Sequence, residues 1–172
     1  ILNSGATILK IEGRGKGPEY VFTVTKAYRQ AIQEIQDGTY TQEKAEVWKE
    51  ELNKVYNRGF WEGYYLGKKY GEWTKHPGSA ATERKIYLGK GLKYFSKIKV
   101  GEFILESGSL EIGDTIMVTS PDFGMMKEEM SCIVANGIEV ERAVKGDLIT
   151  FPSERKIGAK DKLYKILKEK NG

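Results

Sequence analysis

A glycine-rich segment near the start of the chain combines features that bind anions. Residues 13–17 alternate glycine with Arg14 and Lys16; they follow the apolar run 8–11 and precede a helical pattern that Pro18 opens. Free backbone N–H groups at the start of a helix, together with two cations, can bind an anionic ligand. The glycine spacing matches neither the dinucleotide-binding nor the Walker pattern, and a tight turn with solvated charges is the alternative.

Glu12 and Arg14 could take part in catalysis. We expect residues 8–11 to form a strand, which would place both side chains just past its C-terminal end. In β/α barrels that end of the strands carries the active site. An exposed ion pair between the two side chains is the alternative, and composition alone favours it.

An aromatic cluster with interleaved cations is the second candidate binding segment. Aromatic rings and cations together can stack nucleic-acid bases or bind a hydrophobic peptide. The same composition fits a seam that packs a helical part onto the rest of the chain, which is the interpretation we favour. The cluster comprises Tyr56, Phe60, Trp61, Tyr64, Tyr65, Tyr70 and Trp73, with Arg58, Lys68 and Lys69 among them.

The composition argues against several other kinds of site. Cys132 and His76 are the only residues of their types, so the chain alone can form neither an internal disulfide nor an ordinary zinc site. We therefore predict no metal and no cofactor in this chain, and the single cysteine favours a cytoplasmic location. No run approaches the roughly 20 apolar residues that cross a membrane. A net charge of +4 allows nucleic-acid binding without requiring it.

The first part of the chain has helical periodicity. Apolar spacing predicts one helix from Pro18 to the stop signal Gly38 and a second that begins after the N-cap Thr41. With the strand before them, these helices would make residues 1–57 the tail of an α/β domain, for which the family resemblance described below implies a (β/α) barrel. Residues 58–82 would form an aromatic linker.

From residue 84 the apolar period changes to two. We predict an α+β chain whose residues 83–172 form a six-stranded antiparallel β-barrel, because short strands follow one another with glycine-containing turns and no helix between them. The predicted strands are 86–94, 100–105, 114–119, 125–134, 147–151 and 163–167.

Several of these segments resemble one known family. The first of its motifs corresponds here to Lys10-Ile11-Glu12-Gly13-Arg14, Lys16, Pro18-Glu19-Tyr20-Val21 and Ala27-Tyr28-Arg29; the next corresponds to Asn57-Arg58-Gly59-Phe60, Gly63-Tyr64 and Gly67. Together they resemble the collagenase-like peptidases of family U-32, and residues 86–167 resemble that family's C-terminal domain. The Gly-Asp turns before residues 115 and 148 are also similar to the second-domain barrel of elongation factor Tu.

The resemblance implies a role in a longer protein, which we call the parent. An upstream catalytic barrel, outside this chain, would hold any iron–sulfur cluster or zinc, so the chain alone would be inactive. Glu12 and Arg14 would be catalytic only in the parent, and Lys16, Arg58, Phe60 and Tyr64 would bind substrate or an anion.

Three functions follow as hypotheses. The β-barrel would bind a peptide substrate for a peptidase. Alternatively, it would bind RNA for a relative that hydroxylates tRNA or rRNA. In the third, it would only stabilise the parent or form a homo-oligomer. None of these requires a membrane partner.

Overall fold

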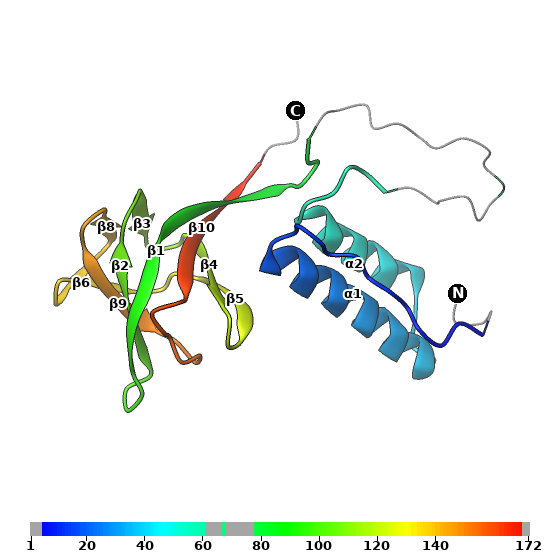
Figure 1. Ribbon diagram of the computed structural model, residues 1–172, viewed down its shortest axis with the longest axis horizontal. Coiled ribbons are helices and arrows are strands. Elements are labelled where there is room, and N and C mark those ends of the chain that lie inside the picture. Colours follow the sequence, from blue (N-terminus) through cyan, green and yellow to red (C-terminus); the bar gives the residue numbers. More distant parts are fainter. Residues whose placement is uncertain (1–4, 61–66, 68–77, 170–172) are drawn as a thin grey trace. The chain divides into compact units, whose positions relative to one another are not determined.

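The computed structural model describes residues 5–60, 67 and 78–169. The chain divides into two compact units, residues 1–82 and residues 83–172, which we call the helical unit and the β unit (Figure 1). No helix in the described part of the chain is long and apolar enough to cross a membrane.

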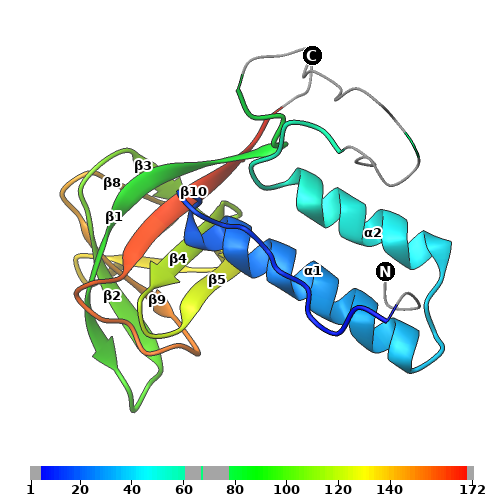
Figure 2. The same ribbon diagram turned by 45° about the vertical axis from the view of Figure 1, so that its right-hand side comes forward.

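Two helices form the helical unit: α1, Pro18–Gln36, and α2, Gln42–Asn53. Figure 2 shows them side by side. Pro18 opens α1, where its fixed φ suits the first turn. Thr41 caps α2, and its hydroxyl oxygen accepts a hydrogen bond from the Lys44 N–H at 3.4 Å. Both predicted helix starts are therefore confirmed.

The strand predicted at residues 8–11 is not present. The structure assigns residues 6–13 to no regular element, and Ile8 is 85% exposed. A strand needs a neighbouring strand to satisfy its N–H and C=O groups, and the described residues 5–60 contain no strand that could pair with residues 8–11. The apolar run 8–11 thus has no partner strand in the described helical unit with which it could form a ladder.

The β unit contains one large antiparallel sheet. Its eight strands lie in the order β5-β4-β10-β1-β2-β9-β6-β7, and β3 pairs with β8 in a separate two-stranded sheet. The bounds are β1 Glu83–Phe95, β2 Val100–Leu105, β3 Ser109–Glu111, β4 Thr115–Ser120, β5 Gly124–Glu129, β6 Ile133–Ala135, β7 Ile138–Val140, β8 Arg142–Val144, β9 Leu148–Pro152 and β10 Lys162–Lys168.

The core of the β unit comes from alternating side chains of several strands, together with Met130 and Ile157 from the loops. The rings of Phe103 and Phe151 stack with centroids 4.9 Å apart, and both side chains are almost completely buried. The rest of the buried cluster is Leu88, Leu105, Leu110, Ile116, Val118, Met130, Ile133, Ala135, Ala143, Ile149, Ile157 and Leu163.

The prediction of α+β architecture is confirmed, but the strand count is wrong. The structure has ten strands in the described residues, not six, because the predicted strand 125–134 divides into β5 and β6 and the three-residue strands β3, β7 and β8 lacked a visible alternation. Three residues show too little of a two-residue period to stand out. In the described part, β5 and β7 form the two ends of the sheet without pairing to each other, so a closed barrel is not confirmed.

Candidate functional site

The glycine-rich segment forms a tight turn on the surface of the helical unit. The Lys16 N–H donates to the Gly13 carbonyl at 3.0 Å, and Gly15 has φ of 70°, a left-handed conformation that favours glycine. Glu12 stabilises the turn, since its Oε1 accepts a hydrogen bond from the Arg14 N–H at 2.8 Å. Both Glu12 and Arg14 are exposed.

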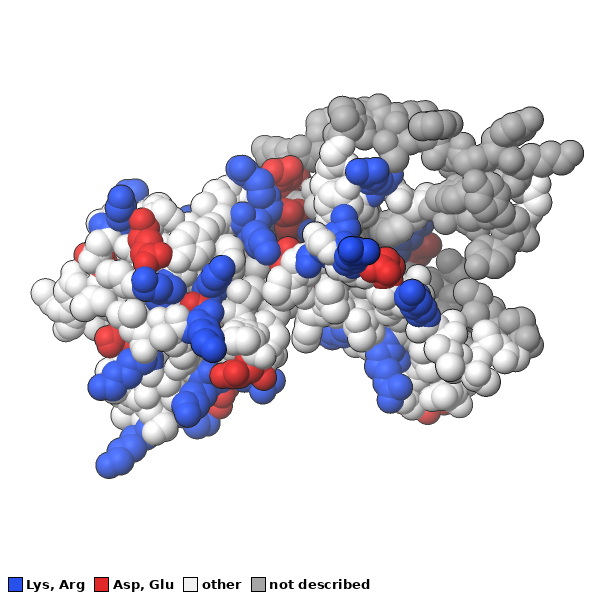
Figure 3. Space-filling model, in the orientation of Figure 1, with Lys and Arg blue, Asp and Glu red and all other residues white. Residues whose placement is uncertain are grey.

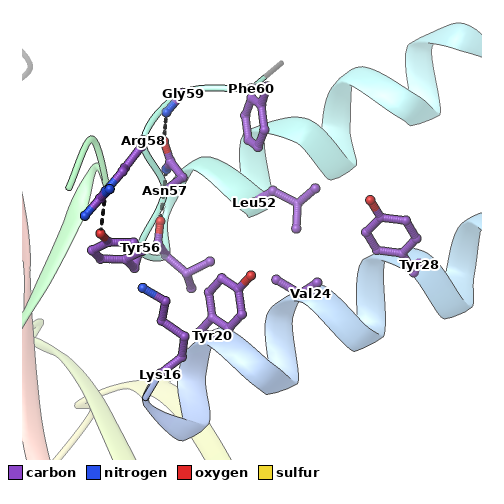
Figure 4. Close-up of a pocket in the computed structure, with 11 residues that line it drawn as sticks. Lys16, Tyr20, Val24, Tyr28, Leu52, Tyr56, Asn57, Arg58, Gly59 and Phe60 are labelled. Carbon is purple, nitrogen blue, oxygen red and sulfur yellow. Dashed lines mark hydrogen bonds between the residues drawn. The ribbon is translucent and has the colours of Figure 1, made fainter. Parts of the chain in front are cut away.

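A pocket of about 370 Å³ lies between α1 and the end of α2 together with the segment that follows it (Figure 4). Tyr20, Val24 and Tyr28 line it from α1, because residues four apart share one face of a helix. The segment after α2 supplies the opposite wall. The other lining residues are Lys16, Leu52, Val55, Tyr56, Asn57, Arg58, Gly59 and Phe60.

Two cations contact one tyrosine at the end of this pocket. The Lys16 Nζ lies 3.2 Å from the centroid of the Tyr56 ring, and the Arg58 Nε donates a hydrogen bond to the Tyr56 hydroxyl at 2.9 Å. Figure 4 shows the two cations approaching Tyr56 from different sides. The hydrogen bond from Arg58, with the charges of Arg58 and Lys16, lowers the pKa of Tyr56. This end of the pocket is therefore positive and suits an anion.

Asn57 fixes the backbone that carries Arg58. Its Nδ2 donates to the carbonyl oxygens of Val55 at 3.0 Å and Asn53 at 3.3 Å, and its Oδ1 accepts from the Gly59 N–H at 3.0 Å. Its own carbonyl accepts from the Ala80 N–H at 2.8 Å. These four bonds hold the chain on both sides of Arg58, so the guanidinium is presented from an ordered loop.

The remainder of the pocket is apolar. Val24 and Val55 are 8% exposed and form the buried part of the wall. Tyr28 and Phe60 keep 47% and 48% of their surface exposed, so their rings are available to a ligand. A pocket with a positive end and aromatic walls suits a molecule that carries an anionic group next to an apolar one.

The structure brings together three of the residues predicted to bind a ligand: Lys16, Arg58 and Phe60. Tyr64 lies outside the described residues. Glu12 and Arg14 do not line this pocket, and their catalytic role stays a prediction.

Sequence reasoning missed Tyr20 and Asn57 as pocket residues, and it assigned Tyr56 to a packing seam. For Tyr20, the spacing of four residues to Val24 and Tyr28 was the available signal. For Asn57, the side-chain hydrogen bonds reach only residues 53, 55 and 59, so its place at the start of the Asn57-Arg58-Gly59-Phe60 segment was the available signal. No group of three or more His, Cys, Asp or Glu residues in the described part of the chain is arranged to hold a metal ion.

Comparison with known proteins connects the chain with peptidases. Residues 1–75 match the family model described as Peptidase family U32. A collagenase of Porphyromonas gingivalis strain W83 is 48% identical over 166 residues, which cover 96% of this chain and 40% of the collagenase. The chain thus spans less than half the length of the curated relatives that it matches over most of its own length.

Two further similarities are more restricted. The tRNA hydroxylation protein P of Helicobacter pylori strain 26695 is 38% identical over 71 residues, which cover 41% of this chain and 16% of that protein. The crystal structure of the C-terminal domain of a U32 peptidase from Geobacillus thermoleovorans superposes with a TM-score of 0.43 and 16% identity, over 46% of this chain and 90% of that domain.

Proposed function

Because the chain belongs to peptidase family U32, we propose that it is the substrate-binding part of a larger U32 protein. In this proposal the pocket of the helical unit binds an anionic group of a peptide substrate together with a neighbouring apolar side chain. The β unit acts as an accessory domain for the same substrate. In this proposal the parent cleaves the bond, and Glu12 and Arg14 are the candidate catalytic residues that this chain contributes.

The arrangement around Tyr56 is the observation that carries this proposal. Lys16 and Arg58 both contact its ring or hydroxyl, and neither cation forms an ion pair with another described residue. A carboxylate that enters the pocket can therefore meet two cations without displacing a carboxylate of the chain. A free C-terminus next to an aromatic or aliphatic residue has this combination of groups, so we favour it as the ligand.

Binding of two short peptides tests the proposal. An acetylated tripeptide that ends in phenylalanine with a free carboxylate is compared, by calorimetry, with its C-terminal amide. A hydrogen bond to a charged group contributes about 1.5–3 kcal/mol, so we expect the carboxylate to bind at least about tenfold more tightly. Arg58→Gln should reduce that difference, since Lys16 is then the one cation left among the described residues at this end of the pocket.

Lys26→Gln is the matched control, because it removes one exposed cation from α1 two positions from the pocket residue Val24 and hence from another face of the helix. Equal affinities of the two peptides, or an equal effect of both variants, would contradict the proposal. For catalysis, unchanged turnover by the Glu12→Gln parent would exclude a catalytic role of Glu12.

We propose as a second possibility that the parent acts on RNA and that the β unit binds it. The similarity to a tRNA hydroxylation protein favours this alternative, although it covers 41% of the chain. The two proposals differ in the unit that binds the ligand, which makes them separable.

A further inference from the structure

Basic residues gather at one end of the β unit. Residues 93–99 and 153–162 together contain seven basic and two acidic residues, a net charge of +5 in a chain whose total is +4. All other residues therefore sum to −1. Figure 3 shows basic side chains around the lower end of the β unit, where Figure 1 places the hairpin between β1 and β2. We call this region the basic end; its cations are Lys93, Lys97, Lys99, Arg155, Lys156, Lys160 and Lys162.

Strand pairing and hydrogen bonds hold the two basic segments together. Val100 of β2 pairs with Pro152 of β9, and just beyond that pair the Ser153 N–H donates to the Lys99 carbonyl at 2.8 Å. The Tyr94 hydroxyl donates to the Ser153 carbonyl at 2.9 Å. On the far side of the loop, the Gly91 N–H donates to the Asp161 carbonyl at 2.9 Å. The hairpin and the loop before β10 therefore form one surface.

Ile157 anchors the loop in the middle of its basic residues. Its side chain is 2% exposed, and it packs where Gly91 and Gly101 have no side chain. A Cβ on either glycine would lie 2.7 Å from a γ carbon of Ile157. Because the anchor is buried, the neighbouring Arg155 and Lys156 project from a fixed backbone and are exposed.

Most of these charges are not neutralised within the chain. Lys99 pairs with Glu154 at 2.8 Å, while the other six basic residues form no ion pair with any described residue. Of the two acidic residues in these segments, Asp161 is buried, as is the anchor Ile157. Glu154 is therefore the exposed acidic side chain. An ordered cluster of unpaired cations of this size is a typical footprint of phosphate binding.

The neighbouring side chains help to identify the anion. None of the exposed large hydrophobic residues in the described β unit is aromatic, and the half-buried Phe95 beside the hairpin has the Lys93 Nζ 4.9 Å from its ring centroid, so no fully exposed ring is available there to stack single-stranded bases. Ile98, 68% exposed, and Leu92, 39% exposed, are the large apolar residues exposed near the hairpin. These two side chains form only a small apolar face. A lipid surface usually binds a broad amphipathic face, so it fits the basic end poorly.

We propose that the basic end binds the phosphate backbone of double-stranded RNA, with the hairpin 96–99 and the loop 153–161 contacting phosphates and Ile98 between them. The inference rests on the second proposed function and names the surface that performs it. Recognition is by charge and shape, since backbone contacts carry no base sequence.

Fluorescence anisotropy of the whole chain with a labelled RNA duplex of about 20 base pairs, over a series of salt concentrations, tests the proposal. If about four cations contact phosphate at once, the slope of log K against log salt should be about −3 to −4. Lys97→Ala/Lys156→Ala should weaken binding about tenfold and make the slope shallower by about two.

Lys145→Ala/Lys168→Ala is the matched control. It removes the same charge from exposed positions; Lys145 lies by the Leu105 end of β2 and Lys168 pairs with the Glu83 end of β1, both away from the hairpin. We expect it to change affinity less than about twofold, because interactions beyond a Debye length are screened.

The outcomes separate the surface from the function. If Lys145→Ala/Lys168→Ala weakens duplex binding as much as Lys97→Ala/Lys156→Ala does, the basic end is not the binding surface. RNA binding by the β unit would still stand. No binding at about 50 mM salt, where phosphate contacts are strong, would overturn both. Tighter binding to duplex DNA of the same sequence, to single-stranded oligouridine or to anionic vesicles would overturn double-stranded RNA as the ligand.

Discussion

The contact between Gly101 and Ile157 gives a quantitative test of how the basic end is held in place. In Gly101→Ala the new Cβ would lie 2.7 Å from Ile157 Cγ1 and 3.1 Å from Phe103 Cε2. Carbon atoms pack best at about 3.5–4.0 Å, so one group must move by about 1 Å. Phe103 is fully buried and stacked on Phe151, so Ile157 must give way. Overpacking of this kind costs about 1–3 kcal/mol.

The reverse change removes the side chain that fills the space. Ile157→Ala should destabilise the β unit by about 2–5 kcal/mol, as for other buried isoleucines. In the double variant the Cβ of the new alanine at position 101 occupies space that Ile157 has left. We therefore expect the double variant to lose less free energy of unfolding than the two single variants lose together, by about 1 kcal/mol or more.

Amide hydrogen exchange of β2 in the whole chain measures these free energies within the β unit. Each kcal/mol increases the exchange rate about fivefold, so Gly101→Ala should accelerate exchange by about 5- to 150-fold. Gly158→Ala is the control in the same loop, because a Cβ there meets no atom within 4 Å. Additive effects within about 0.3 kcal/mol, or a Gly158→Ala effect as large as that of Gly101→Ala, would refute the reasoning.

Three further predictions concern titration and capping. Arg58→Gln removes the strongest influence that lowers the pKa of Tyr56, so this pKa should rise in NMR spectra of ¹³C-labelled tyrosine; an unchanged value would contradict the contact. Burial, then the Glu106 hydrogen bond, raises the pKa of Tyr87 from 10.0 to about 12. As the pH rises, the unfolded chain loses this proton before the folded chain does. The free energy of unfolding should therefore fall between pH 10.0 and about pH 12, and it should fall less steeply in Tyr87→Phe. Thr41→Ala should destabilise α2 by about 1 kcal/mol in amide exchange, and Thr41→Ser should not.

Local signals in the sequence were sufficient for the helices and for the change to β structure. Pro18 and Thr41 mark helix starts because a fixed φ and a capping hydroxyl act within one turn of the chain. The period of two after residue 84 identified a β unit for the same reason, since each side chain's face depends on its immediate neighbours. Lys16, Arg58 and Phe60 were found as candidates from their residue types, their local positions and the resemblance to family U-32.

Tertiary structure decided which of these residues act together and how the strands are ordered. The pocket joins Lys16 to Arg58, and the basic end joins residues 93–99 to residues 153–162, across separations that no periodicity spans. Strands of three residues, such as β7, exist because neighbours pair with them. The run 8–11 is apolar enough for a strand but forms none, since its hydrogen-bonding groups find no partner strand in the described helical unit. The sequence by itself thus determined the local conformation. Only the fold determined which groups pair with the backbone N–H and C=O groups and which charged side chains lie together.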